Sequence, residues 1–264
     1  MNLESLCMDV VELSREVGIF IKMEEGKVRA TDIEEKSINS LVSYVDKTAE
    51  EKLIKELTLL LPESGFIAEE DTSKKIGDRY NWIVDPLDGT TNFLHGIPTY
   101  SVSVALREGD EIILGVVYEV NRDECFYAWK KGNAFLNGEQ IHVSSTKVIK
   151  NSLLATGFPY YDFDRSDSYF KLLKAMVHES RSVRRIGSAA VDMAYVACGR
   201  FDGFVEYSLN AWDVAAGAIL IKEAGGTVTD FNGENNWLFG KEMLATNTAL
   251  FKEFSTMVRN NMGN

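Results

Sequence analysis

The chain has 264 residues, of which 45% are hydrophobic and 26% charged, and its formal net charge is −12. Such a length and composition allow a substantial hydrophobic core and exclude a disordered or fibrous protein. An acidic surface repels nucleic acid and anionic membranes, so we expect neither as a partner, although acidity also serves solubility in many enzymes.

The first half of the chain predicts helices followed by a sheet. Apolar residues recur at steps of three and four over residues 3–22 and 47–61, which is typical of amphipathic helices. Asn137-Gly138 tolerates positive φ and predicts a hairpin between 134–136 and 140–143. Strand-like runs separated by short turn signals precede that hairpin at 82–84, 100–107, 112–118 and 124–129.

The second half alternates between the two kinds of element. The predicted order is strand, helix, helix, strand, helix and strand, at 152–156, 168–178, 188–197, 203–206, 214–224 and 227–229. No repeat or linker divides the chain, so a single domain of residues 1–264 is expected. Because helices and strands are mixed while the strands of the first half run together, the expected fold class is α/β tending to α+β.

The cysteines and the N-terminal residues indicate the cellular compartment of the protein. Cys7, Cys125 and Cys198 form no CxxC pair, so neither a disulfide framework nor a zinc site is indicated. Glu4 and Asp9 stand where a signal peptide needs basic residues followed by an apolar run. We therefore expect a soluble protein in the cytoplasm.

Two carboxylates, Asp85 and Asp88, follow a short apolar run in the segment WIVDPLDGTTNF. Pro86 restricts its own φ and favours extended geometry at Asp85, so a rigid turn is expected to project both acids from the end of a strand. Gly89 allows the backbone to approach a ligand, and the N–H groups after it can hold a phosphate. The alternative is an ordinary Asp-Gly turn with two solvated acids.

Further acids occur elsewhere in the chain. Glu69 opens the run Glu69-Glu70-Asp71 after an apolar step, and Asp213 precedes the helix expected at 214–224. Oxygen ligands suit Mg²⁺, and several carboxylates gathered without a metal would repel one another. Taken singly, the run could be a solvated charged segment and Asp213 a helix N-cap. A shared magnesium site would account for all of these acids together.

Three segments, GFIAEED, WIVDPLDGTTNF and AWDVAAGAILIKEAGG, closely resemble the signature segments of inositol monophosphatases, within the magnesium-dependent, lithium-sensitive phosphatases. The resemblance runs from about residue 46 to about residue 226. It implies a layered α-β-α-β-α sandwich of the type shared with fructose-1,6-bisphosphatase, with a metal-binding lobe at about 1–145 and a substrate-side lobe at about 150–264. It also implies a homodimer, inhibition by lithium and a small phosphorylated metabolite as substrate.

Carried over by position, the resemblance implies the residues that perform the chemistry. Thr90, Asp46 and Glu69 would act on the attacking water, and the backbone N–H groups of Gly89 and Thr90 would hold the phosphate. Two or three Mg²⁺ ions would be held by Glu69, Asp85, the Leu87 carbonyl, Asp88 and Asp213.

On the substrate side, a carboxylate at Glu206 can accept hydrogen bonds from vicinal hydroxyls, which suits a polyol. Ser188 could instead be an N-cap and Glu206 merely solvated. Arg184 and Arg185 could pair with a phosphate, but we expect them to form a structural or subunit-interface ion pair. The substrate contacts that the resemblance implies are Gly89, Thr90, Gly187, Ser188, Ala189, Glu206 and Asp213.

The expected activity is therefore hydrolysis of a phosphomonoester, inositol 1-phosphate first, by attack of a metal-activated water. Alternatives on the same fold are phosphatases for fructose 1,6-bisphosphate, histidinol phosphate or 3′-phosphoadenosine 5′-phosphate. A phosphatase of the haloacid-dehalogenase type, with a nucleophilic aspartate, is disfavoured because its two acids stand at i and i+2, whereas Asp85 and Asp88 stand at i and i+3. A regulatory module that binds a partner protein is the non-enzymatic alternative.

Overall fold

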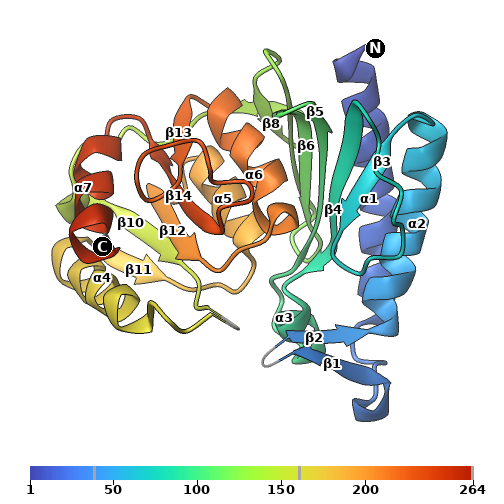
Figure 1. The fold of residues 1–264 in the computed structure, drawn as a ribbon, viewed down its shortest axis with the longest axis horizontal. Coiled ribbons are helices and arrows are strands. Elements are labelled where there is room, and N and C mark those ends of the chain that lie inside the picture. Colours follow the sequence, from blue (N-terminus) through green and yellow to red (C-terminus); the bar gives the residue numbers. More distant parts are fainter. Residues whose placement is uncertain (38–39, 160–161, 263–264) are drawn as a thin grey trace.

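The computed structural model describes residues 1–37, 40–159 and 162–262, which form five alternating layers of helices and sheets (Figure 1). Two helices cover the outer face of a seven-stranded sheet, two lie between the sheets, and two cover the outer face of a five-stranded sheet. This α-β-α-β-α order confirms the expected fold class. In that order the helix pairs are α1 (Leu3–Glu24) with α2 (Tyr44–Leu60), α5 (Ala189–Ala197) with α6 (Ala211–Glu223), and α4 (Ser166–Glu179) with α7 (Phe251–Met262).

The seven-stranded sheet comes from one continuous stretch of the chain. Strand-like runs predicted the part from residue 82 onward, whereas the strand at Gly65–Ala68 was not expected. The strands pair in sequence order, with the first two parallel and every later pair antiparallel. Asn137 and Gly138 have φ values of 48° and 92°, which confirms the predicted hairpin. The strands are β3 (Gly65–Ala68), β4 (Tyr80–Asp88), β5 (Ser101–Glu108), β6 (Glu111–Glu119), β7 (Glu124–Trp129), β8 (Ala134–Leu136) and β9 (Glu139–Ile141).

The five-stranded sheet mixes parallel and antiparallel pairs in the order β11-β10-β12-β14-β13. Its members are β10 (Leu153–Thr156), β11 (Ser182–Arg184), β12 (Gly203–Tyr207), β13 (Gly226–Thr229) and β14 (Glu242–Asn247). Sequence patterns predicted β10, β12 and β13, whereas β11, β14 and the final helix α7 were not expected. A separate hairpin of β1 (Ile33–Ser37) and β2 (Ser40–Ser43) precedes α2 and was not expected either.

Small residues allow the middle helices to lie between the two sheets. Gly115 of β6 faces α6 so closely that an added Cβ would lie 2.9 Å from the Cα of Ala216. The buried alanines of α5 and α6 fill this layer without forcing the sheets apart, because close packing tolerates little extra volume. None of the helices in the described part of the chain combines the length and apolar character that a bilayer crossing requires.

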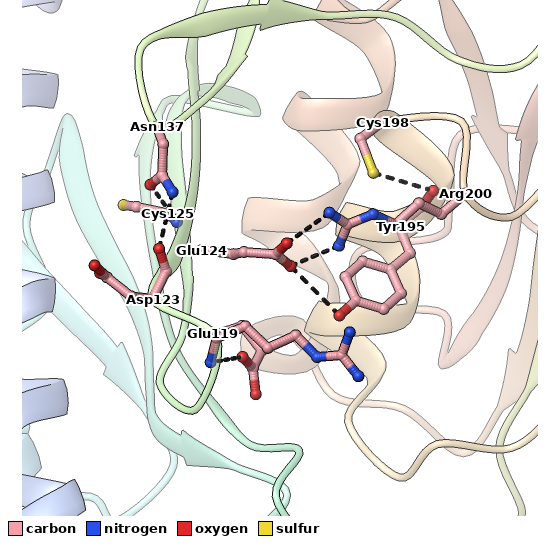
Figure 2. A network of polar contacts seen from close by, with 9 residues as sticks. Glu119, Asp123, Glu124, Cys125, Asn137, Tyr195, Cys198 and Arg200 are labelled. Atoms are coloured by element: carbon pink, nitrogen blue, oxygen red, sulfur yellow. Dashed lines mark hydrogen bonds and ion pairs between the residues drawn. The ribbon is translucent and has the colours of Figure 1, made fainter.

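A charged clamp ties the seven-stranded sheet to the middle helix layer (Figure 2). Arg200 lies just after α5. Its two terminal guanidinium nitrogens each donate to the Glu124 carboxylate at the start of β7, at a distance of 2.5 Å. The Arg200 guanidinium also stacks 4.7 Å from the centre of the Tyr195 ring. Such a bidentate pair fixes orientation as well as distance.

We expect a double-mutant cycle of Glu124→Gln and Arg200→Ala to give a coupling energy of about 1 kcal/mol. The value stays modest because the side chain of Arg200 is 38% exposed and water screens the pair. Urea unfolding of the wild type, both single variants and the double variant measures the coupling. A coupling of zero would mean that the clamp contributes nothing to stability.

Candidate active site

Six carboxylates from both halves of the chain line one cavity of about 130 Å³. They come from the ends of β3, β4 and β12 and from the first turns of α5 and α6. The acids are Glu69, Asp85, Asp88, Asp192, Glu206 and Asp213. Five of the acids that the sequence singled out therefore lie together, and Asp192, which it did not single out, joins them; Asp46 does not line the cavity.

The segment that carries Asp85 and Asp88 is strand, not a turn. Strand β4 runs through to Asp88, and its pairing with β5 shifts register between the two acids. The expected rigid turn was therefore wrong: a bulge-like irregularity at Pro86 and Leu87 interrupts the register instead. The Leu87 N–H donates to Asp85 Oδ1 over 3.0 Å, which fixes the first carboxylate.

Gly89 ends this strand with φ of 98° and serves as the N-cap of the short helix α3 (Thr90–Leu94). A side chain at this position would be strained, and its Cβ would lie 3.1 Å from the Thr99 carbonyl oxygen. Gly89 and Thr90 both line the cavity, as the phosphate-holding prediction requires. That contact itself stays a prediction.

Asp46 meets Thr90 across 44 residues of chain. The Thr90 hydroxyl donates to Asp46 Oδ1 at 2.9 Å and lies 3.0 Å from the Leu87 carbonyl oxygen. The other Asp46 oxygen accepts from the N–H and the hydroxyl of Ser43, in the capping box of α2. Burial raises the pKa of Asp46, while these hydrogen bonds oppose the rise. The result is a buried carboxyl with one oxygen aimed at the Thr90 hydroxyl.

Asp88 is held by the start of α5, 100 residues further along the chain. Ser188 Oγ donates to Asp88 Oδ2 over 2.6 Å and the Ala190 N–H donates to the same oxygen over 2.7 Å. Ser188 is also the N-cap of α5, as its alternative interpretation held. Its hydroxyl is thus engaged with a carboxylate, and its predicted contact with substrate stays a prediction. Gly187 and Ala189 line the cavity beside it.

Asp213 lies in the first turn of α6. The helix begins at Ala211, three residues earlier than predicted, and its N-cap is Asn210. The N-cap interpretation of Asp213 was therefore wrong: it is the third helical residue of a capping box, whose Oδ2 accepts from the Asn210 N–H over 2.6 Å. This position directs the carboxylate into the cavity.

Of the acidic run after β3, only Glu69 lines the cavity. Its N–H donates to the Val84 carbonyl over 3.2 Å, which places it beside the strand that carries Asp85. Asp71 is exposed and adopts φ of 53°, as a solvated loop residue does. The solvated-run interpretation thus fits Asp71 but not Glu69.

Asp192 is the acid that sequence reasoning missed. It is 1% exposed, and neither carboxylate oxygen has a hydrogen-bond partner in the described part of the structure. Burial raises its pKa well above the usual range, and the nearby Glu206 and Asp88 add to the rise. The available signal was an acid within AAVDMAYVA, a helix that is otherwise almost wholly apolar.

Glu206 is buried rather than solvated, and Gly157 makes room for it. A Cβ at Gly157 would lie 2.1 Å from both carboxylate oxygens of Glu206. Arg185 lines the same cavity, and its positive charge opposes the raised pKa of Glu206. The expected structural or subunit-interface ion pair stays a prediction. Arg184 is exposed and bonds locally to Ser182 and Val183.

The electrostatics of the cavity favour a cation. Burial raises the pKa of Asp85 well above its usual range, and the charges of Glu69, Asp88 and Asp213 raise it further. Among the described residues, no three acid, histidine or cysteine side chains are grouped closely enough to hold an ion as they stand. The donors nevertheless fit Mg²⁺ in kind, because they are carboxylates and a backbone carbonyl, and no histidine or cysteine of residues 1–37, 40–159 and 162–262 lines the cavity. A divalent cation would relieve the repulsion among acids that are desolvated together.

Stability should therefore depend jointly on pH and Mg²⁺. The pKa values of Asp85, Asp213 and Glu206 are raised in the folded state. Their protonation therefore stabilises the folded state fully below the unfolded-state pKa values, which lie near 4. This stabilisation is lost as the pH rises through the folded-state pKa values. Because Mg²⁺ binds deprotonated carboxylates, we expect it to raise Tm by several degrees more at about pH 8 than at about pH 5. Thermal unfolding at both pH values with and without Mg²⁺ checks this, and an equal shift at both would contradict it.

Comparison with known proteins agrees with this geometry. The family model described as the inositol monophosphatase family matches residues 3–261. The chain belongs to the inositol monophosphatase family. This membership confirms the resemblance seen in the three motifs.

Relatives within the family carry different names. The chain is 37% identical to a Pseudomonas aeruginosa protein named Nus factor SuhB, over 93% of each chain. It is 38% identical to a Thermotoga maritima protein named fructose-1,6-bisphosphatase/inositol-1-monophosphatase, over 94% of this chain and 93% of that one. The crystal structure of the extragenic suppressor protein suhB from Bartonella henselae matches with a TM-score of 0.90 at 37% identity, covering 95% of this chain and 96% of that one. The comparisons thus show the family, but its members are named after different functions.

Proposed function

We propose that the chain is a Mg²⁺-dependent phosphomonoesterase whose preferred substrate is a polyol phosphate such as inositol 1-phosphate. The observation that supports this best is the convergence of Glu69, Asp85, Asp88 and Asp213 on one cavity beside the pair formed by Asp46 and Thr90. When bound there, Mg²⁺ would neutralise the phosphate oxygens, lower the pKa of water and stabilise the leaving alkoxide.

The protein's own groups orient the attacking water and hold its proton. The Thr90 oxygen donates its hydrogen to Asp46, so its lone pairs are free to accept a proton from water in the cavity. Asp46 then takes the Thr90 proton, and the bonds from Ser43 keep the receiving carboxyl in place. Glu69 provides a further carboxylate at the same wall of the cavity.

The roles of the metal ligands follow from their positions in the cavity. The proposed ligands are Glu69, Asp85, the Leu87 carbonyl, Asp88 and Asp213, with two or three ions between them. In this proposal the lobe at about 1–145 supplies most ligands, and the lobe at about 150–264 adds Asp213 and the substrate contacts at Gly187, Ser188, Ala189 and Glu206.

The second half of the cavity favours a polyol with a single phosphate. Glu206 offers acceptor oxygens to hydroxyl groups, while Arg185 is the one basic side chain among the described residues that line the cavity. Within the described part of the chain, Arg185 would be the single cationic contact for the distal phosphate of a bisphosphate, and the nearby Glu206 and Asp192 carboxylates would repel that phosphate. The substrate is therefore expected to be uncharged outside its reacting phosphate.

The substrate proposal is tested by kcat/KM for inositol 1-phosphate, fructose 1,6-bisphosphate and adenosine 3′,5′-bisphosphate with Mg²⁺. We expect inositol 1-phosphate to exceed the other two by at least about tenfold, roughly the value of one well-made hydrogen bond to a charged group. A higher value for either bisphosphate would overturn the polyol assignment. Inhibition by lithium, which the resemblance implies, stays a prediction for the same assay.

A regulatory binding role is the second candidate, because the Pseudomonas aeruginosa relative is named a Nus factor. The expectation of no nucleic-acid partner therefore stays a prediction, as does the homodimer. Deleting the gene in its host and restoring either wild type or Asp213→Asn separates the two roles. If both forms restore what the deletion strain has lost, the binding role is favoured. If the wild type alone restores it, the phosphatase is favoured.

A further inference from the structure

Glu50 is a fully buried carboxylate that the proposed reaction does not use. It is 0% exposed and lies on α2, one helical turn after Asp46. Residues four apart on a helix share a face, so α2 presents two buried acids toward the same side of the fold. Asp46 contacts Thr90, just beyond the end of β4, and Glu50 contacts the loop that follows β3.

Among the described residues, the hydrogen bonds to the Glu50 carboxylate come from that loop. Its Oε2 accepts from the Glu70 N–H over 2.8 Å. Its Oε1 accepts from the Thr72 N–H over 2.9 Å and from the Thr72 hydroxyl over 2.7 Å. A buried charge is costly unless its oxygens are hydrogen-bonded, and here three donors from two loop residues satisfy it.

These contacts fix Glu69 from both sides. Its own N–H is bonded to the Val84 carbonyl, immediately before Asp85, and the next N–H along the chain is bonded to Glu50. The backbone of Glu69 therefore lies between β4 and α2. Two of the three donors to the Glu50 carboxylate are backbone N–H groups. Such directional hydrogen bonds restrict the position of the loop more narrowly than apolar contacts do.

We propose that Glu50 is a positioning residue for the metal site: by holding Glu70 and Thr72, it keeps the Glu69 carboxylate at the same wall of the cavity as Asp85. The inference rests on the proposed function, because it takes Glu69 as a metal ligand. Helix α2 then aligns both acid-bearing segments, through Asp46 at one turn and Glu50 at the next.

The test is Glu50→Gln, which keeps the shape but can offer an acceptor to only one of the two loop residues. Mn²⁺ binding followed by electron paramagnetic resonance is the first readout, and the Mg²⁺ dependence of phosphate release is the second. We expect the half-saturating concentrations of Mn²⁺ and Mg²⁺ to rise about tenfold, as they do when a residue that orients a metal ligand by hydrogen bonding is changed. The value of kcat at saturating Mg²⁺ should change less than about twofold. Glu51→Gln, the same change at the exposed neighbouring position, is the matched control.

The two readouts separate the inference from the function on which it rests. Wild type that binds Mn²⁺ but releases no phosphate would remove the proposed function, while the Mn²⁺ comparison would still decide the role of Glu50. Mn²⁺ affinity in Glu50→Gln equal to that of Glu51→Gln would overturn the inference, whatever happens to Tm. A purely structural role would lower Tm and leave both half-saturating concentrations unchanged.

A milder variant covers the case in which Glu50→Gln fails to fold. Thr72 is exposed, and Thr72→Val removes only the hydroxyl bond while it keeps the backbone bond. We expect a rise of about threefold in half-saturating Mn²⁺, consistent with the loss of one hydrogen bond. Thr256→Val on α7 makes the same chemical change far from the cavity. Unchanged Mn²⁺ affinity in Thr72→Val would overturn the inference.

Discussion

Replacing Asp213 by Asn should lower kcat/KM for phosphate release about 10³-fold, because the charge of a proposed metal ligand, which is worth several kcal/mol, would be lost. The change is confined to charge, since the Asn oxygen can still accept the Asn210 N–H that holds Asp213 now. The helix cap should therefore survive, and with it the start of α6. Steady-state phosphate release at fixed Mg²⁺ measures the loss.

The same variant should not destabilise the metal-free protein. The charge of Asp213 raises the pKa of the buried Asp85, so removing it relieves repulsion within the cavity. Tm without Mg²⁺ should stay level or rise, while the stabilisation that Mg²⁺ confers should shrink. Asp167→Asn, an exposed aspartate in the first turn of α4, is the matched control. Retention of more than about a tenth of wild-type kcat/KM would show that Asp213 is not a metal ligand.

Thr90→Val should lower kcat between about 10² and 10⁴-fold, the range expected when a group that transfers a proton in the reaction is removed. Valine has nearly the shape of threonine but cannot pass a proton to Asp46, whose Oδ1 lies 2.9 Å from the Thr90 hydroxyl. Half-saturating Mg²⁺ should change little, because the hydroxyl is not a proposed ligand.

The partner in this pair offers an internal check. Asp46→Asn should produce a loss of similar size, and the double variant with Thr90→Val should be little worse than either single one, since the two groups act as a unit. Losses that multiply would show that Thr90 and Asp46 act independently. Thr256→Val serves as the control for the hydroxyl-to-methyl change.

Local patterns were sufficient for most of the fold. Apolar spacing located α1 and α2, and positive-φ residues located the hairpin at Asn137 and Gly138, because these signals depend only on near neighbours. Strands β11 and β14 were missed, since a short strand is defined by its partner strand and has little pattern of its own. Helix α7 does carry helical spacing in Phe254, Met257 and Val258, so that omission was avoidable.

Five of the six acids that line the cavity were predicted from the sequence, whereas Asp192 and the contacts that support the acids were not. The spacing of Asp85 and Asp88 pointed to paired ligands, but the bulge that separates them depends on pairing with β5. Contacts such as Ser188 to Asp88 join residues 100 positions apart, and Glu50 meets Thr72 across 22. No local pattern encodes such contacts, because the topology alone brings the residues together.

The central claim is that the acidic cavity hydrolyses a phosphomonoester only with a divalent cation bound. Its most direct test is release of inorganic phosphate from inositol 1-phosphate by the wild-type protein, stripped of metal with a chelator and then titrated with Mg²⁺. We predict release that is absent without metal, rises to saturation with Mg²⁺ and is lost throughout the titration in Asp213→Asn. Release from the stripped protein at the saturated rate, or none at any Mg²⁺ concentration from this or any other small phosphate ester, would contradict the account.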